Sequence, residues 1–174
     1  MIVIDGYNLL YALHGIEHDM PIKDLQNART ELHEMLSRFF NITSEHLLVV
    51  YDARSGNSQP SEERAGLRVV YAPANASADD YIVRFVQKSK RPTHITVVTS
   101  DKGLAERLKE FGAKVMKSSS FHKRVLEAFE KGPEQTDDGK AFEKPGRPSL
   151  DEIDLFLDAF SDDTRKRGPD EPVE

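Results

Sequence analysis

The chain has 174 residues, with 24 Lys and Arg side chains against 30 Asp and Glu, and a formal net charge of −6. Residues 1–131 carry 18 basic and 17 acidic side chains, a net charge of +1, whereas residues 132–174 carry 6 and 13, a net charge of −7. A near-neutral body does not exclude nucleic acid as a partner, which a uniformly acidic protein would repel. The absence of cysteine excludes disulfides, thiol nucleophiles and cysteine-ligated metals.

The start of the chain does not resemble a targeting segment. The apolar run Met1–Ile4 ends at Asp5, and no apolar stretch reaches the length of about 18 residues that a membrane-spanning helix requires. We therefore expect a soluble cytoplasmic protein without a membrane partner.

Five short runs rich in β-branched residues occur in the first 131 positions. They are Met1–Ile4, His46–Asp52, Leu67–Tyr71, Thr93–Thr99 and Ala113–Lys117. Continuous apolar runs of this kind suit strands that are covered on both faces, as in a parallel sheet.

Helical patterns separate these runs. They cover Ile22–Phe40, a segment that Ser77 opens as an N-cap, Lys102–Phe111, and Ser120–Lys131. Strands that alternate with helices predict an α/β fold with a layered architecture.

The remaining residues differ in composition from this body. Residues 132–148 contain three Gly and three Pro and are expected to form a linker. Residues 149–160 begin with a capping box, Ser149 to Glu152, and predict an amphipathic helix that docks on the body or on a partner. Residues 161–174 are expected to be disordered.

Acidic residues follow four of the predicted strands. Asp5 and Asp52 end the first and second strands, Asp79 and Asp80 open the helix after the third, and Asp101 follows the fourth. Taken singly, each is better explained as a turn or helix-capping residue. Together they meet at the carboxyl edge of a parallel sheet, where like charges repel unless a cation neutralises them. Oxygen ligands without cysteine favour Mg²⁺ or Mn²⁺.

Four short blocks, in this order along the chain, resemble a known family. The blocks are Asp5-Gly6-Tyr7-Asn8, Val50-Tyr51-Asp52-Ala53, Ser77-Ala78-Asp79-Asp80 and Thr99-Ser100-Asp101. Together they resemble the NYN domain, a PIN-like nuclease fold, and in particular its bacterial YacP-like branch. The resemblance implies a three-layer α/β domain over residues 1–131, with a five-stranded parallel sheet in the order 3-2-1-4-5 flanked by helices.

The same resemblance implies a metal-dependent endoribonuclease that hydrolyses RNA phosphodiester bonds with one or two Mg²⁺ or Mn²⁺ ions. The implied catalytic residues are Asp5, Asn8, Asp79, Asp80 and Asp101, of which the four aspartates are metal ligands. Asn8 would orient the substrate or a metal-bound water, and Asp52 and Ser100 would support the site. Some members of the branch are thought to cleave mRNA on ribosomes, which makes mRNA and the ribosome candidate partners.

Four residues are candidates for holding the RNA itself. Arg54 directly follows the block that contains Asp52, Lys88 and Arg91 end a predicted helix, and Tyr7 offers an aromatic ring on which a base can stack. Taken singly, each basic residue is better explained as part of a solvated face or as a favourable charge at a helix end. Tyr7 is equally well explained as a packing residue.

Other functions fit the sequence less well. The main alternative is a non-catalytic PIN-like module that binds RNA or the ribosome, for which clustered acids have no evident use. The string His14-Gly15-Ile16-Glu17-His18 matches a zinc-peptidase pattern, but Gly15 and the following Pro21 disfavour the continuous helix which that site requires. A phospho-receiver domain would leave the Asp79-Asp80 pair unexplained.

Overall fold

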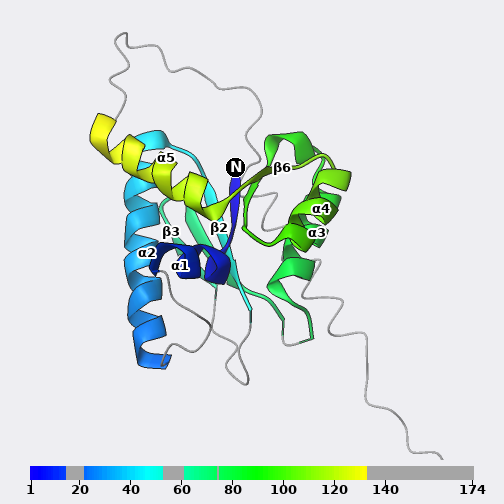
Figure 1. Cartoon of the computed structure of the whole chain (residues 1–174), viewed down its shortest axis with the longest axis horizontal. Coiled ribbons are helices and arrows are strands. Elements are labelled where there is room, and N and C mark those ends of the chain that lie inside the picture. The colour runs from blue at the N-terminus through cyan, green and yellow to red at the C-terminus, as the bar shows by residue number, and fades with distance from the viewer. Residues whose placement is uncertain (15–21, 53–60, 74, 133–174) are drawn as a thin grey trace, which may run out of the picture. The chain divides into compact units, whose positions relative to one another are not determined.

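Six strands form one sheet in the described part of the chain (Figure 1). The computed structural model describes residues 1–14, 22–52, 61–73 and 75–132. The strands are β1 (Ile2–Asp5), β2 (Leu47–Tyr51), β3 (Glu62–Arg64), β4 (Leu67–Tyr71), β5 (Thr96–Val98) and β6 (Lys114–Met116). Their order in the sheet is β3-β4-β2-β1-β5-β6.

The expected sheet of five parallel strands is wrong in strand number, in full strand order and in its wholly parallel character. Five strands correspond to the five predicted runs and pair in parallel, but β3 pairs antiparallel with β4 at one edge. The sequence Glu62-Glu63-Arg64 was not predicted because all three residues are charged and exposed, without apolar alternation. Charged residues on such an edge strand discourage pairing with a second chain.

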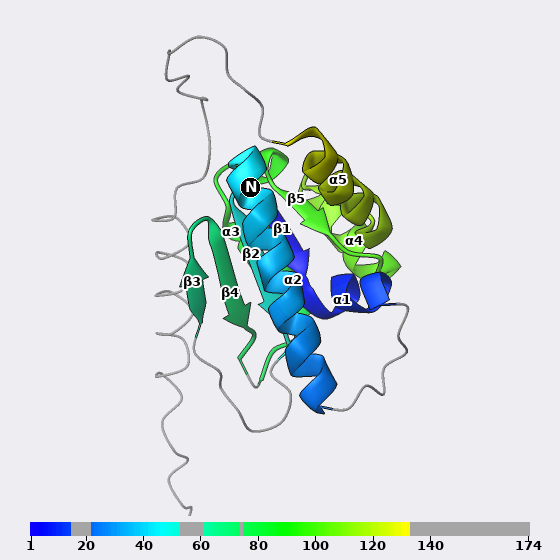
Figure 2. The same ribbon diagram turned by 90° about the vertical axis from the view of Figure 1, so that its left-hand side faces the viewer.

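Helices cover both faces of the sheet. They are α1 (Gly6–His14), α2 (Ile22–Thr43), α3 (Ala78–Lys88), α4 (Lys102–Glu110) and α5 (Ser118–Lys131), and a short 3₁₀ turn, η1 (Pro92–His94), precedes β5. Helices α1, α2 and α5 lie on one face, and α3 and α4 lie on the other, so the described residues form three layers (Figures 1 and 2). Alternate side chains of a strand point to opposite faces of the sheet. In β1, Ile2 and Ile4 belong to the hydrophobic core cluster that includes residues of α1, α2 and α5.

Helix α1 was not predicted. Its first residues, Gly6-Tyr7-Asn8, are weak helix formers, and the apolar run that follows is too short to establish a helical period. The Asp5 carboxylate starts the helix by accepting a hydrogen bond from the Asn8 N–H (3.1 Å). Gly6 is needed at the first position because any Cβ there would lie 2.3 Å from a ring carbon of Tyr51.

Part of the predicted organisation lies outside the described residues. This applies to Arg54, to all but the first residue of the linker at 132–148, to the amphipathic helix at 149–160 and to the tail at 161–174. Within the described residues, no helix is both long enough and apolar enough to span a membrane.

Candidate active site

The predicted acidic residues lie where neighbouring strands end. Asp5 is the last residue of β1, Asp52 follows β2, and Asp101 follows β5 as the N-cap of α4. The three strands are adjacent, in the order β2-β1-β5. After β1, the chain adds β2, β3 and β4 on one side of it and then β5 and β6 on the other side. This is the switch point at which open α/β sheets place their ligand sites.

Asp5 is the most buried of these acids, with 8% of its surface exposed. Its carboxylate accepts hydrogen bonds from the Asn8 N–H (3.1 Å) and the Thr99 hydroxyl (3.3 Å). Burial, together with the charges of Asp79 and Asp52, raises the pKa of Asp5 to about 7 in spite of these hydrogen bonds. The charged form of Asp5 is therefore unfavourable near neutral pH unless a cation compensates it.

Asp79 is the second acid whose charge is unfavourable in this environment. Its pKa is raised first by burial and then by the charges of Asp101 and Asp52. Because Asp5 and Asp79 each respond to the other acids, the carboxylates of Asp5, Asp52, Asp79 and Asp101 share one electrostatic environment. The four belong to three different strand ends and to the helix α3.

Asp52 and Asp101 also hold helices in place. The Asp52 carboxylate accepts a hydrogen bond from the N–H of Ala78, the first residue of α3, at 2.6 Å. This bond fixes the N-terminus of the helix that carries Asp79. The Asp101 carboxylate accepts a hydrogen bond from the N–H of Leu104 (2.7 Å) and so caps α4. Helix capping is also the explanation that the sequence favours for Asp101 taken singly.

Asp80 faces a different neighbour from Asp79. Its carboxylate accepts a hydrogen bond from the Arg107 guanidinium at 2.9 Å, and both side chains are about half exposed (48%). The pKa of Asp80 is lowered, mainly by this hydrogen bond. Ser77 caps α3 as predicted, with its hydroxyl accepting the Asp80 N–H at 3.1 Å. Arg107 had not been identified from the sequence, because it lies 27 positions away on α4.

The orientation of the Asn8 amide follows from its partners. Its Oδ1 accepts hydrogen bonds from the Ser100 N–H (2.8 Å) and from the Ser118 hydroxyl (3.3 Å). A backbone N–H only donates, so Oδ1 must face Ser100 and the Nδ2 group must face away from it. Ser118, the first residue of α5, is fully buried, and its N–H donates to the Ser100 Oγ at 3.3 Å. Ser118 was missed because nothing in its sequence context links it to Asn8. Thr99 lies in one of the four blocks, but no role was predicted for it.

A pocket of about 430 Å³ opens beside these residues. Its lining combines two carboxylates, the Asn8 amide and two aromatic rings. The lining residues are Asp5, Tyr7, Asn8, Tyr11, Ala12, Asp52 and Ser100. Of the predicted RNA-contacting residues that the structure describes, which are Tyr7, Lys88 and Arg91, only Tyr7 lines this pocket. Its ring is 8% exposed and packs edge-on against Tyr51, with centroids 4.9 Å apart, so most of its surface belongs to the core.

Lys88 and Arg91 lie away from the acids. Helix α3 begins at the acidic edge and runs for 11 residues, about 16 Å, before it ends at Lys88. Arg91 then precedes η1 and β5, at the amino edge of the sheet. Both side chains are exposed. The structure therefore does not bring these two residues to the acidic cluster.

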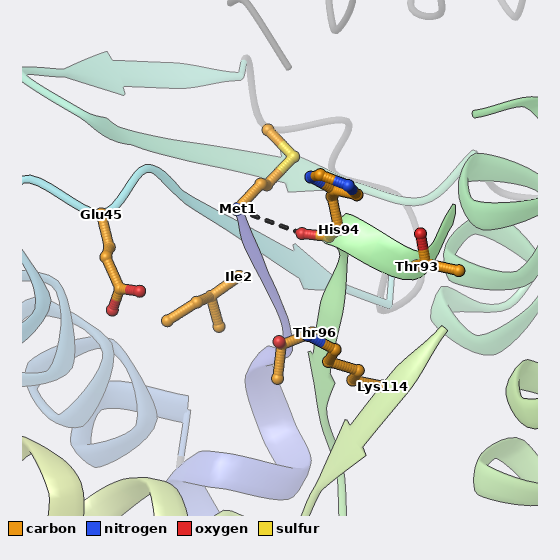
Figure 3. Close-up of a pocket in the computed structure, with 7 residues that line it drawn as sticks. All are labelled: Met1, Ile2, Glu45, Thr93, His94, Thr96 and Lys114. Carbon is orange, nitrogen blue, oxygen red and sulfur yellow. Dashed lines mark hydrogen bonds between the residues drawn. The ribbon is translucent and has the colours of Figure 1, made fainter. Parts of the chain in front are cut away.

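A second pocket, of about 460 Å³, lies at this amino edge (Figure 3). Figure 3 shows the amino group of Met1 directed at the carbonyl oxygen of His94, with Thr96 and Lys114 at the starts of β5 and β6. Its lining contains one carboxylate, Glu45, which forms an ion pair with Arg124. A single paired carboxylate does not offer the oxygen-rich surroundings found at the carboxyl edge.

The donor chemistry of the carboxyl edge fits a magnesium-type ion. No three Asp, Glu or His side chains of residues 1–14, 22–52, 61–73 and 75–132 form a ready-made coordination set. Mg²⁺ does not require one, because it usually keeps several waters and is held by one or two carboxylates together with substrate phosphates. Asp5 and Asp79 are the two acids best suited to this, since burial and the charges of neighbouring acids make their own charges costly without a cation.

Comparisons with known proteins agree on one family. The model of the YacP-like NYN domain matches residues 2–154. The crystal structure of Rae1 (YacP) from Bacillus subtilis matches with a TM-score of 0.63 and 21% identity, over 95% of this chain and 90% of that chain. A Trp-to-Leu mutant of the same protein matches with a TM-score of 0.61 and 23% identity, over 75% and 77% of the two chains. The chain matches no curated protein sequence. At these identities the structural matches establish the fold.

Proposed function

Because the chain belongs to the family of YacP-like NYN domains, a family of PIN-like nucleases, we propose that it is a metal-dependent endoribonuclease. The observation that carries the proposal is the shared electrostatic environment of four carboxylates at the switch point of the sheet. A structural role accounts for Asp52 and Asp101, which hold helix ends, and in part for Asp5, which starts α1. It leaves unexplained why Asp79 is placed where burial and the other acids disfavour its charge.

One or two Mg²⁺ or Mn²⁺ ions complete the proposed site. Asp5 and Asp79 would hold the first ion, and Asp101 or Asp80 would join through Oδ2, since Leu104 and Arg107 each engage only Oδ1. A bound ion would neutralise phosphate charge and make a water molecule more acidic, which is the chemistry that hydrolysis of a phosphodiester needs.

The protein's own groups would position the substrate. Asn8, with its Oδ1 occupied, offers an Nδ2 donor to a phosphate oxygen or to the base beside it. Asp52 keeps the start of α3, and therefore Asp79, beside Asp5. Ser100 holds Asn8 through its backbone and Ser118 through its hydroxyl.

RNA, including mRNA on the ribosome, is the proposed substrate. The residues of the body other than the five acids carry a net charge of +6, so a metal-loaded site would lie in a basic body that attracts a phosphate backbone. Lys102 and Lys117 are exposed cations at the carboxyl edge, where they follow β5 and β6. Lys88 and Arg91 would contact only RNA that extends toward the amino edge, and Arg54 stays a proposed contact from the sequence.

The test is cleavage of labelled RNA by the full chain, with Mg²⁺ or Mn²⁺ and with EDTA, on free RNA and on translating ribosomes. We expect cleavage only in the presence of metal. Binding without cleavage on every substrate would instead support the alternative, a non-catalytic module that binds RNA or the ribosome.

A further inference from the structure

The aromatic wall of the pocket beside the acids has no role in the function proposed so far. Helix α1 contributes Asn8, Tyr11 and Ala12 to the pocket, at positions i, i+3 and i+4, which lie on one face of a helix. Asp5 and Asp52 line the same pocket from the ends of β1 and β2. The pocket is therefore acidic at the strand ends and aromatic along α1.

The Tyr11 ring is held in place by a series of packed rings. Tyr7 stacks on Tyr11 with centroids 6.1 Å apart and an interplanar angle of 22°. Tyr7 packs edge-on against the fully buried Tyr51, which stacks in turn on Tyr71 at 5.5 Å. Tyr11 is the member that is only partly buried and that lines the pocket. A ring fixed in this way loses little conformational freedom when a ligand stacks on it.

A polar group adjoins this ring. Asn8 lies about one helical turn before Tyr11 on the same face, and its Oδ1 is engaged by Ser100 and Ser118. The Nδ2 donor is the part of the amide that remains for a ligand in the pocket. An aromatic surface beside a fixed amide donor is the combination with which proteins bind a nucleobase.

We propose that this pocket binds the base of one nucleotide next to the phosphate at the acidic cluster, with Tyr11 as the stacking surface. The inference rests on the proposed ribonuclease function and names its substrate class. A base can enter the pocket only if it leaves a duplex stack, so the substrate is single-stranded RNA. Tyr11, rather than the core residue Tyr7, is the aromatic residue that contacts the RNA.

A binding experiment with abasic RNA tests this site. A short fluorescent single-stranded oligoribonucleotide, and versions with one abasic position each, are titrated with the full chain in Ca²⁺ and followed by anisotropy. For the parent protein, we expect one abasic position to weaken binding at least roughly fivefold. Tyr11→Ala should weaken binding of the intact RNA by a similar factor and should lose the sensitivity to that abasic position, whereas Tyr11→Phe should behave as the parent.

Two further variants control for loss of folding and for a general effect of substitution on RNA binding. Tyr11→Leu keeps apolar bulk on α1 and should fold as the parent does, yet it should bind like the alanine variant. Leu126→Ala removes an exposed side chain from α5 and should leave binding unchanged. Equal abasic penalties in the parent, Tyr11→Ala and Tyr11→Leu would overturn the proposed base site.

The outcome separates this site from the nuclease proposal. A parent that cleaves RNA but shows no coupling between Tyr11 and any base overturns the base site and leaves the nuclease function intact. A parent that shows the coupling but cleaves no RNA with Mg²⁺ or Mn²⁺ supports the base site and overturns the nuclease function. A parent that binds none of these RNAs overturns both.

Discussion

The buried hydroxyl of Ser118 donates a hydrogen bond to the Asn8 Oδ1 at 3.3 Å, although the two residues lie 110 positions apart. This contact connects the start of α5 with the first turn of α1, and the Ser100 N–H reinforces it at 2.8 Å. It fixes which end of the Asn8 amide faces the pocket. In the proposed site, Ser118 is therefore a positioning residue that acts through Asn8.

Ser118→Ala should lower the cleavage rate by roughly three- to tenfold, because losing one net hydrogen bond of about 1 kcal/mol leaves Asn8 less firmly oriented. The loss should appear in kcat more than in KM, and Ser118→Thr, which retains the hydroxyl, should recover most of it. Ser119→Ala, at an exposed neighbouring position, is the control. A Ser118→Ala enzyme whose kcat equals that of the parent would contradict the positioning role.

Asp5 makes stability depend on pH. Its pKa is about 7 in the folded chain against an ordinary value of 3.8, so the folded state holds a proton between these values that the unfolded state has lost. The contribution of Asp5 to the free energy of unfolding is therefore fully present below about pH 4, decreases as the pH rises toward 7, and stays constant above that pH. The loss is up to about 4 kcal/mol for this residue. Asp79 contributes in the same direction.

Asp5→Asn removes the ionisable group and keeps the shape of the side chain. In EDTA, the variant should be more stable than the parent at pH 8, and this advantage should shrink toward zero near pH 4. Urea unfolding at the two pH values measures the difference. If the parent gains stability relative to the variant on going from pH 4 to pH 8, the assigned environment of Asp5 is wrong.

The neighbours Asp79 and Asp80 should respond differently to the same substitution. Asp79→Asn removes a proposed metal ligand and should abolish measurable cleavage. Asp80→Asn should lower the rate by about tenfold or less, because the Asp80 carboxylate faces Arg107. The ion pair is half exposed, so Asp80→Asn and Arg107→Gln should each cost less than about 1 kcal/mol of stability. Equal losses of activity in the two aspartate variants would place Asp80 in the metal site.

Substitution of two pairs of exposed basic residues tests which edge of the sheet contacts RNA. The double variant Lys102→Ala, Lys117→Ala removes cations from the acidic edge, and Lys88→Ala, Arg91→Ala removes the same charge from the other edge. The first pair should weaken binding of a short RNA and reduce the slope of log K against log salt by roughly 1 to 1.5, since each phosphate contact contributes about 0.7. The second pair should have little effect on a short RNA, and the reverse pattern would place the RNA along the amino edge.

Much of the sheet was predictable because burial on two faces leaves β-branched runs such as Leu47–Tyr51 in the sequence. The same runs located the ends at which Asp5 and Asp52 lie. The charged edge strand β3 and the short helix α1 left no such pattern, since one is exposed and the other begins with residues typical of turns.

The finer structure of the site depends on contacts between distant segments. The ion pair of Asp80 with Arg107 and the hydrogen bond of Asn8 with Ser118 join different helices, so no local spacing signals them. The division of roles between Tyr7 and Tyr11 has the same origin, because Tyr51 packs against Tyr7 and makes it a core residue. The sequence blocks therefore predicted the positions of the acids, Asn8 and Ser100, but gave no sign of Ser118 or Arg107.

The central claim is that the carboxyl edge of the sheet, with Asp5 and Asp79, forms a metal-dependent ribonuclease site. Its most direct test is the single-turnover cleavage rate of labelled single-stranded RNA in Mg²⁺ or Mn²⁺ for the parent, Asp5→Asn, Asp79→Asn and the control Glu110→Gln, which alters an exposed acid at the end of α4. We expect cleavage by the parent and the control, and a loss of at least roughly a hundredfold in the two aspartate variants. Equal cleavage by all four proteins, or none by the parent, would contradict it.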